Sequence, residues 1–385
     1  MNSNLNANKD LHIVRREDLP QLFNILIKDG HQIVGPTLRD GAIVLDVLEG
    51  VAELPLGWTD EQDKARYRLV KRKDEALFGY SCGPQTWKKF LFPPDHILFK
   101  ADKTRHGWRI DAGENAPPKF AFLGMRACDI HALTELDKVF IAGEYQDSAY
   151  LERRENIFII SINCSVVGNN CFCTSMGSGP GAASGYDLGL TEIIDSDLHY
   201  YLIEVGSEKG EEVLGEIKHR TASQEEIRKG NELLTAAAQA ISLKVDTEKL
   251  PKILKKSIEH PRWKEIASRC LTCGNCTMVC PTCFCSTVQD YTDLRGSQAS
   301  RLRKWDSCFN IEYSYIHGGS VRYSSEARYR QWMMHKFASW IDQFGSFGCV
   351  GCGRCITWCP AGIDVTEELR FFCQNPLLDT TAKSA

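Results

Sequence analysis

One cysteine pattern occurs twice in the C-terminal third of the chain. Each copy has three cysteines at three-residue spacing and a fourth cysteine directly before a proline; the copies run from Cys270 to Pro281 and from Cys349 to Pro360. Three thiolates at this spacing can surround one side of a [4Fe–4S] cubane, and in two-cluster proteins the fourth cysteine binds the other cluster. Glycines within both copies allow the backbone to approach the inorganic core.

The repeat therefore predicts two [4Fe–4S] clusters with crossed ligand sets. One cluster is expected to bind Cys270, Cys273, Cys276 and Cys359, and the second Cys349, Cys352, Cys355 and Cys280. Crossing brings the clusters close together, as an electron relay requires. The alternative is a pair of structural zinc sites, but zinc domains usually supply cysteines in C-x2-C pairs rather than in runs of three plus one.

The use of cysteine along the chain also favours metal binding. Of 17 cysteines, five precede residue 200 and twelve lie between Cys270 and Cys373. The first ten residues lack the apolar segment of a secretory signal, so we expect a reducing, cytoplasmic compartment in which clustered cysteines bind metal or do redox chemistry. A net charge of −4 gives no indication of nucleic-acid binding. Apolar runs such as 157–162 are too short to span a membrane.

The N-terminal part has the pattern of an α/β domain. Residues 119–124 and 156–162 resemble buried strands, and residues 129–140 between them have a helical pattern, which predicts a βαβ unit with a parallel sheet. Upstream, we expect a helix after Asp18 and a hairpin over 31–48. Two further segments are expected to be irregular or extended: the Gly-rich stretch 174–189, which we interpret as loop, and residues 90–99, which we interpret as extended loop or edge strand.

The pattern becomes helical further along the chain. Helices are predicted over 223–241, where Ser223 and Glu226 form a capping box, over 250–259, and over 325–344. The expected class is α+β, with a partly parallel N-terminal α/β domain and a mainly helical dicluster ferredoxin-like domain. The expected boundaries are 1–220 for the α/β domain, 221–262 for a helical linker and 263–385 for the dicluster domain.

Four cysteines outside the repeat could form a third site. Cys128 and Cys164 each follow one of the two predicted parallel strands, so both thiols would lie at the carboxyl edge of the sheet, where α/β proteins usually place ligands. Cys171 and Cys173 follow in the next loop. These four thiols could bind a third [4Fe–4S] cluster, or they could be buried thiols that pack as small apolar side chains.

The other cysteines and loops have weaker patterns. Cys283, Cys285 and Cys308 are too few for another cubane, so we expect them to pack beside the clusters or tune them. Cys82 and Cys373 have no partner pattern and are interpreted as structural. The chain has neither a G-x-G-x-x-G nor a Walker sequence, so no NAD or ATP site is expected. The basic stretch 295–304 could be solvated surface or could dock an acidic partner.

Several motifs in order along the chain resemble one family. The chain is similar to beta subunits of cytoplasmic [NiFe] hydrogenase/sulfur reductase complexes (sulfhydrogenases) and to the related A subunit of anaerobic sulfite reductase. The motifs that carry the resemblance are Arg126–Asp129, Asn163-Cys164, Cys171-Phe-Cys173, Glu259–Trp263, Cys270–Cys285, Arg303–Cys308 and Cys349–Pro360.

The resemblance implies an electron carrier that is not itself catalytic. One partner would be a flavin subunit that handles NAD(P)H; the other would be the small and large subunits of a [NiFe] hydrogenase, or a sulfite or sulfur reductase. The resemblance also implies that Cys128, Cys164, Cys171 and Cys173 are ligands of a third cluster. The alternative hypothesis is a catalytic chain that binds flavin or a disulfide or sulfur substrate at the Cys128/Cys164 edge.

Overall fold

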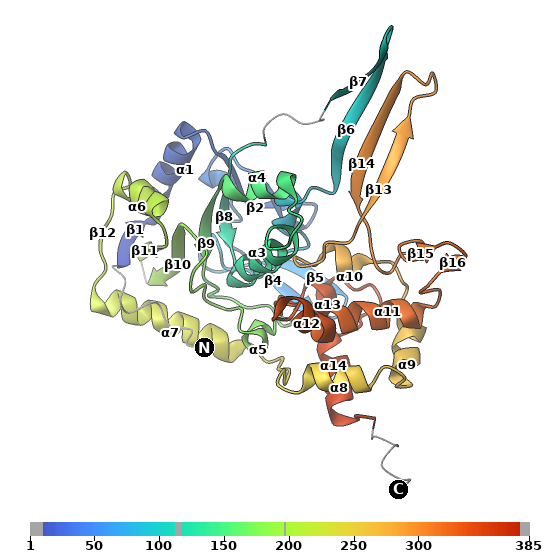
Figure 1. The fold of residues 1–385 in the computed structure, drawn as a ribbon. Coiled ribbons are helices and arrows are strands. Elements are labelled where there is room, and N and C mark those ends of the chain that lie inside the picture. Colours follow the sequence, from blue (N-terminus) through green and yellow to red (C-terminus); the bar gives the residue numbers. More distant parts are fainter. Residues whose placement is uncertain (1–10, 112–116, 196–197, 378–385) are drawn as a thin grey trace.

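A computed structural model describes residues 11–111, 117–195 and 198–377 (Figure 1). The expectation about the first ten residues lies outside this part of the chain. The described residues form an N-terminal α/β region, a protruding antiparallel arm and a C-terminal region rich in short helices.

The N-terminal region is built on a mixed eight-stranded sheet. Pairings of β10 with β9, β9 with β8 and β8 with β2 are parallel, and the outer pairings are antiparallel. This confirms the partly parallel sheet and the adjacency of the two predicted buried strands. In spatial order the strands are β12 (Arg220–Thr221), β1 (Leu11–Arg15), β11 (Leu198–Val205), β10 (Leu188–Asp195), β9 (Ile157–Ile162), β8 (Phe120–Met125), β2 (Gln32–Arg39) and β3 (Ala42–Val47).

Helices cover this sheet and connect its strands. The crossover from β8 to β9 contains the predicted helix α3 (Ala127–Phe140) and also α4 (Ser148–Glu155). The first helix, α1 (Leu19–Lys28), starts at the predicted place, although the Asp18 side chain accepts a hydrogen bond from Gln21 Nε2 instead of capping the helix backbone. The remaining helices of this region are α5 (Cys173–Met176), α6 (Glu208–Gly215) and α7 (Gln224–Ala240), whose capping box is confirmed.

A four-stranded antiparallel arm extends from the body of the molecule (Figure 1). Its order is β13 (Ser286–Thr292), β14 (Gln298–Trp305), β6 (Asp95–Thr104) and β7 (Gly107–Asp111). The prediction for residues 90–99 was wrong in two respects, because the short helix α2 (Lys88–Leu91) comes first and β6 is an inner strand. Its partner β14 comes from the segment between the two cysteine motifs, where the expectation of helix fails for residues 286–305.

The C-terminal region packs short helices around both cysteine motifs. The predicted helix over 325–344 is present as α11 (Ser325–Met334), a π-helical turn (His335–Ser339) and α12 (Trp340–Phe344), and it ends at Gly345 in the left-handed conformation. The other helices are α8 (Leu250–Lys256), α9 (Arg262–Arg269), α10 (Asn275–Met278), α13 (Arg354–Thr357) and α14 (Val365–Gln374). Two hairpins complete the fold: β4 (Trp58–Asp63) with β5 (Arg66–Lys71), and β15 (Tyr315–Ile316) with β16 (Gly319–Ser320).

The core of the C-terminal region is aromatic and surrounds the thiols. Trp263, Phe309, Phe337 and Phe372 are almost fully buried. Five cysteines of the two motifs pack against this group: Cys270, Cys276, Cys349, Cys355 and Cys359. Within the described ranges, no helix combines the length and apolar character that crossing a membrane requires.

Candidate metal centres

The first motif surrounds a cavity near the surface. Cys270 follows α9 directly, and the loop then turns through left-handed residues at Thr272 (φ 51°) and Gly274 (φ 73°). The cavity is lined by five thiols and by aromatic side chains from outside the motifs: Cys270, Cys273, Cys276, Cys355 and Cys359, with Phe309, Tyr329 and Trp332. The structure therefore brings together the four cysteines of the first predicted set, although Cys359 comes from the second motif.

The second motif lies deeper in the molecule. Its loop uses left-handed glycines at Gly351 (φ 63°) and Gly353 (φ 75°) before α13. Burial raises the pKa of Cys355 well above its ordinary value, and the neighbouring thiols of Cys349, Cys352 and Cys280 raise this pKa further. Cys280 comes from the first motif, so the second crossed set is also brought together.

A backbone amide donates to a sulfur at the same position of both motifs. Thr272 N lies 3.4 Å from Cys270 Sγ, and Gly351 N lies 3.4 Å from Cys349 Sγ. Hydrogen bonds to ligand sulfurs help to set the reduction potential of an iron–sulfur cluster. The loop geometry therefore suits thiolate ligands in both copies.

A buried lysine lies beside the second motif. Lys336 is 4% exposed, and its ammonium donates to Cys280 Sγ (3.2 Å), Thr282 Oγ1 (2.9 Å) and Gly348 O (3.0 Å). Burial alone would lower the pKa of Lys336, but the thiols of Cys280, Cys283 and Cys349 raise it well above its ordinary value.

The charge of Lys336 indicates whether the site suits an anionic cluster. None of its three hydrogen-bond partners in the described chain is a carboxylate. A buried ammonium without a counter-charge is costly, whereas thiolate-ligated iron–sulfur clusters are anionic. Lys88, 3% exposed, approaches from the N-terminal region and donates to the carbonyls of Cys280 and Cys283. The donor set and the buried cations thus fit the cluster that the repeat predicts.

The thiols of the N-terminal region gather next to the second motif. Cys128 lies at the start of α3 and Cys164 follows β9. Cys171 lies in the following loop and Cys173 is the first residue of α5, so all four are at the carboxyl edge of the parallel strands. Cys128, Cys171 and Cys173 are buried and Cys164 is half-buried. The convergence that the strand pattern predicted is present.

The loop that carries Cys171 and Cys173 is bound tightly to the second motif. Phe172 N donates to Gly351 O (2.8 Å), Ser178 Oγ donates to Val350 O (2.5 Å), and Cys171 Sγ lies 3.9 Å from Cys352 O. This contact joins the N-terminal thiols to the second cluster motif without an intervening layer.

Two buried guanidinium groups accompany these thiols. Arg126 and Arg354 are each 3% exposed. Arg354 pairs with Asp129 (2.9 Å), while Arg126 donates to the carbonyls of Phe78 and Tyr80. Burial alone would lower the pKa of Arg354, but Asp129 and then the thiols, Cys82 foremost, raise it. The two guanidinium groups carry two positive charges and Asp129 balances one of them, so the site has a positive charge left over that suits an anionic group.

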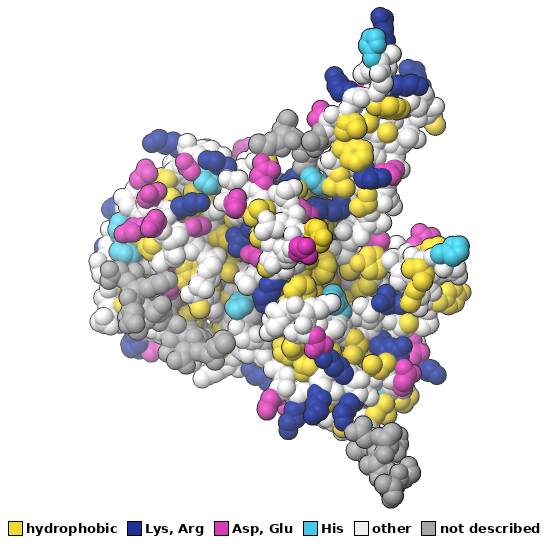
Figure 2. Space-filling model, viewed as in Figure 1, with side chains coloured by type: hydrophobic (Ala, Val, Ile, Leu, Met, Phe, Trp, Pro, Cys, Tyr) yellow, Lys and Arg dark blue, Asp and Glu magenta, His cyan; other side chains and the backbone are white. Residues whose placement is uncertain are grey.

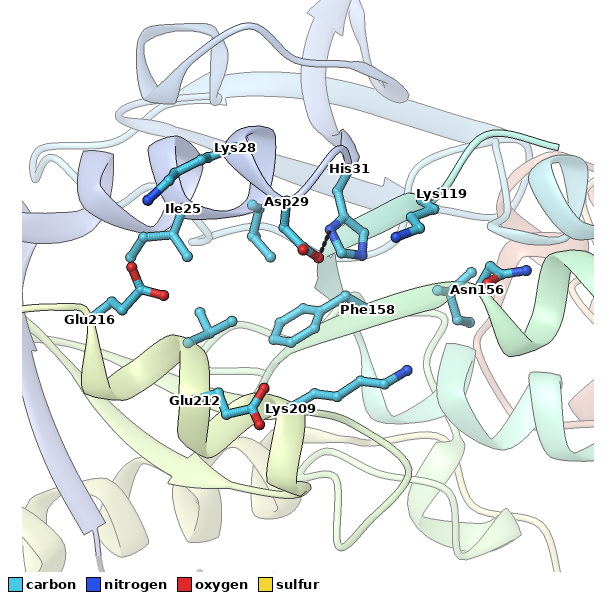
Figure 3. Close-up of a pocket in the computed structure, with 13 residues that line it drawn as sticks. Ile25, Lys28, Asp29, His31, Lys119, Asn156, Phe158, Lys209, Glu212 and Glu216 are labelled. Carbon is cyan, nitrogen blue, oxygen red and sulfur yellow. Dashed lines mark ion pairs between the residues drawn. The ribbon is translucent and has the colours of Figure 1, made fainter. Parts of the chain in front are cut away.

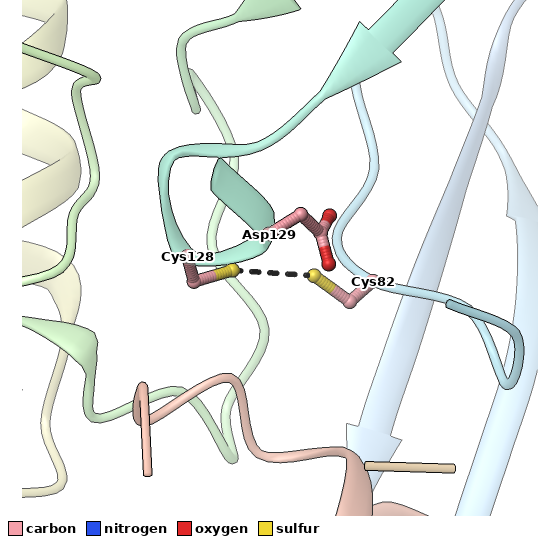
Figure 4. A group of neighbouring side chains, drawn as sticks. All are labelled: Cys82, Cys128 and Asp129. Atoms are coloured by element: carbon pink, nitrogen blue, oxygen red, sulfur yellow. Dashed lines mark hydrogen bonds between the residues drawn. The ribbon is translucent and has the colours of Figure 1, made fainter. Parts of the chain in front are cut away.

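Cys82 is the thiol that the sequence did not indicate. It lies in the loop between β5 and α2, and its Sγ is 3.9 Å from Cys128 Sγ (Figure 4). Its hydrogen bond with Cys128 lowers the pKa of Cys82. No spacing rule could have found it, because its partners are brought near only by the folding of the sheet. Cys373 lies apart, in a pocket with Lys244 and Arg370.

The three cysteines that follow the first motif lie between the two cluster motifs. Cys283 hydrogen-bonds with Cys280, and Cys285 hydrogen-bonds with Cys308. The bond to Cys308 is the main cause that lowers the pKa of Cys285 to about 6. These contacts agree with the expected position beside the clusters.

A separate pocket opens at the opposite edge of the sheet (Figure 3). It lies at the amino ends of β2, β8 and β9. Its lining combines basic, acidic and apolar side chains, among them Lys119, Lys209, Asp29, Glu212 and Phe158. Burial lowers the pKa of His31. Because β9 separates this pocket from Cys164 by the full length of a strand, roughly 20 Å at the usual rise per residue, the pocket is not part of the thiol sites.

Comparison with known proteins agrees with the geometry. Residues 269–363 match the model of the 4Fe-4S dicluster domain, a domain that carries two such clusters. Sulfhydrogenase 2 subunit beta of Pyrococcus furiosus is 36% identical over 313 residues, which cover 79% of this chain and 89% of that protein.

Proposed function

Because the chain belongs to the family of sulfhydrogenase beta subunits, we propose that it relays single electrons between a flavin subunit that oxidises NAD(P)H and a terminal unit. The chain is the iron–sulfur subunit of a sulfhydrogenase-like complex. The terminal unit we propose is a [NiFe] hydrogenase small and large pair, or a sulfur or sulfite reductase. The 17 unpaired cysteines fit a reducing, cytoplasmic compartment.

The observation that carries the proposal is the continuity of the thiol sites. We assign Cys270, Cys273, Cys276 and Cys359 to one cluster, and Cys349, Cys352, Cys355 and Cys280 to the second. The first cavity has an exposed thiol, Cys273, and so reaches the surface, whereas the second motif is buried against the loop 170–178. Bound clusters supply one-electron transfer.

The N-terminal thiols extend this series with a third [4Fe–4S] cluster. The family resemblance assigns it to Cys128, Cys164, Cys171 and Cys173. Three of these thiols are buried, and they lie against the second motif rather than at an open pocket, which favours a bound cluster over a substrate that must enter and leave.

The chain's own residues have three tasks in this relay. Lys336 and Arg354 place buried positive charge beside the thiols and so favour the anionic ligand state. The aromatic side chains of Phe309, Tyr329 and Trp332 exclude water from the first cavity. The arm supplies surface for a partner subunit: apolar side chains, including Trp108 and Ile110, are exposed along it among basic ones (Figure 2).

The experiment that tests the relay separates half-reactions from the coupled reaction. In the assembled complex, Cys276→Ser should not change either half-reaction, that is, the oxidation of NAD(P)H by an artificial dye or the reaction of the terminal unit with a dye. Electron transfer from NAD(P)H to the terminal unit should fall by at least about 100-fold. Cys373→Ser, at a thiol outside the sites, is the matched control.

Two results would contradict the proposal. Coupled transfer at the wild-type rate in the Cys276→Ser complex would show that electrons bypass this chain. Flavin bound to the chain purified alone, with NAD(P)H turnover, would favour the catalytic alternative at the Cys128/Cys164 edge.

A further inference from the structure

Five thiols, rather than four, gather at the N-terminal site. The fifth is Cys82, whose Sγ is 3.9 Å from that of Cys128, with a carboxylate oxygen of Asp129 within 4.8 Å of both sulfurs (Figure 4). A [4Fe–4S] cluster takes one thiolate for each of its four irons. The site therefore contains one cysteine more than a cubane needs, and the question is which thiol is left over.

Cys82 packs inside the thiol group. It is 9% exposed and belongs to the same buried cluster of side chains as Cys128, Cys171 and Cys173. Its backbone carbonyl accepts a hydrogen bond from Gln62 Nε2 (3.1 Å), which fixes the loop at this point. Cys82 therefore lies inside the buried part of the site.

Cys164 has a different environment. It is half-buried and is not part of the buried cluster that contains the other four thiols. It follows β9, and the next residue upstream, Asn163, accepts from Arg126 Nη1 through its carbonyl (3.4 Å). Cys164 thus lies at the margin of the site, whereas the Cys82 thiol is in contact with the Cys128 thiol inside it.

Arg354 provides an independent indication that an anionic group belongs here. Its Nη2 pairs with Asp129, but its Nη1 is buried and has no hydrogen-bond partner among the described residues. A buried donor without a partner costs about 1–3 kcal/mol. An inorganic sulfide or a cysteine thiolate of a cluster would accept this hydrogen bond and balance the surplus positive charge of Arg126 and Arg354.

We propose that Cys82, together with Cys128, Cys171 and Cys173, binds the N-terminal iron–sulfur cluster, and that Cys164 is the thiol left free. This inference rests on the third cluster of the proposed function and changes its ligand set. Cys82 reaches the site from the loop that precedes α2, so the cluster joins that loop to α3 and to the loop before α5.

The test compares single variants of the full chain prepared anaerobically. The expected iron content is about twelve atoms per chain for the wild type and for Cys164→Ala, and about eight for Cys82→Ala. The EPR spectrum of reduced Cys82→Ala should lose one cluster signal and retain the signals of the two C-terminal clusters. Cys373→Ala is the matched control and should keep about twelve irons.

The outcomes separate this inference from the proposed function. Twelve irons in Cys82→Ala, or eight in Cys164→Ala, would overturn the ligand assignment while leaving the third cluster in place. Eight irons in the wild type would overturn the third cluster itself. One metal ion beyond those eight irons in the wild type, lost in Cys82→Ala, would indicate a mononuclear site and would also overturn the inference.

A second variant keeps the test valid if Cys82→Ala does not fold. Cys82→Ser has nearly the native shape and offers an oxygen in place of sulfur. Replacement of a ligand sulfur should alter the EPR signal of the N-terminal cluster alone, and an unchanged signal would overturn the assignment. Retained C-terminal signals show that the protein is folded.

Discussion

The two cysteine motifs have the same spacing but lie in different environments. The first motif borders a cavity with aromatic walls and has an exposed thiol at Cys273. The second motif is covered by the N-terminal region and has the buried ammonium of Lys336 at 3.2 Å from Cys280 Sγ. Because burial, charge and hydrogen bonds to sulfur set cluster potentials, equal spacing here does not imply equal redox behaviour.

The variable positions of the motifs reflect this difference. Asn275 and Arg354 occupy the same position of the two copies, yet Asn275 donates to the Trp358 carbonyl, whereas Arg354 is paired with Asp129 of the N-terminal region. Likewise, Thr272 of the first copy corresponds to Gly351 of the second. The cysteines define the ligand sets, and the residues between them adapt each copy to its neighbours.

The largest expected effect concerns the crossing of the ligand sets. Cys359→Ser should remove the first cluster, which we assign to Cys270, Cys273, Cys276 and Cys359, and lower the iron content by about four atoms per chain. Iron analysis and EPR of the reduced protein measure this loss, with Cys373→Ser as control. Selective loss of the second cluster, whose motif contains Cys359, would show that the sets are not crossed.

How much of this arrangement the sequence predicts depends on the range of the contacts. The strands β8 and β9 and the helix α3 follow from local periodicity, and the structure has them where they were expected. The ligand sets follow from the spacing of the repeat and stay a prediction. The pairing of β6 with β14 was missed because about 200 residues separate the strands and neither has a turn signal linking it to the other.

The missed residues of the sites have the same explanation. Lys336 lies within a regular helical pattern, and only the π-helical turn at His335–Ser339 and the packing of that helix bring its ammonium to Cys280. Cys82 lies 46 residues from Cys128 with no shared motif. Buried cations and isolated thiols become informative only when tertiary contacts are known.

The second prediction tests the contact that buries the second motif. A Cβ at Gly351 would lie 2.7 Å from backbone atoms of Phe172 and Cys173, and the residue has a left-handed φ of 63°. Gly351→Thr should therefore separate the loop 170–178 from the motif and destabilise the protein by more than about 4 kcal/mol. Thermal unfolding of the holoprotein measures this. Wild-type stability would mean that the two regions do not pack as described.

The third prediction concerns the charge that distinguishes the two sites. Lys336→Met removes a cation next to Cys280 Sγ. At about 5 Å and an effective dielectric constant of about 20, this charge contributes about 3 kcal/mol. For a one-electron couple that is about 130 mV, so after partial relaxation we expect a shift of about 100 mV to more negative potential for the second cluster.

Redox titration followed by EPR measures this shift for each cluster. Lys336→Arg preserves the charge, so it should change the potential of the second cluster by less than about half of the shift caused by Lys336→Met. The potential of the first cluster should stay nearly constant in both variants. An equal shift of both clusters would mean that Lys336 does not distinguish the two sites.

The smallest effect is expected at the corresponding position of the first motif. Thr272 has a left-handed φ of 51°. For a β-branched residue this conformation is strained by about 1–3 kcal/mol, while glycine adopts it without strain but loses about 1 kcal/mol more backbone entropy on folding. Thr272→Gly should therefore stabilise the protein by about 0.5–1 kcal/mol and leave the hydrogen bond from its backbone N to Cys270 Sγ in place. Chemical unfolding under anaerobic conditions measures the change, and a loss of stability would mean that the threonine side chain contributes more than its strain costs. The left-handed backbone disfavours threonine at both positions. The effect at Gly351 is expected to be larger because a side chain there would also clash with the backbone of Phe172 and Cys173.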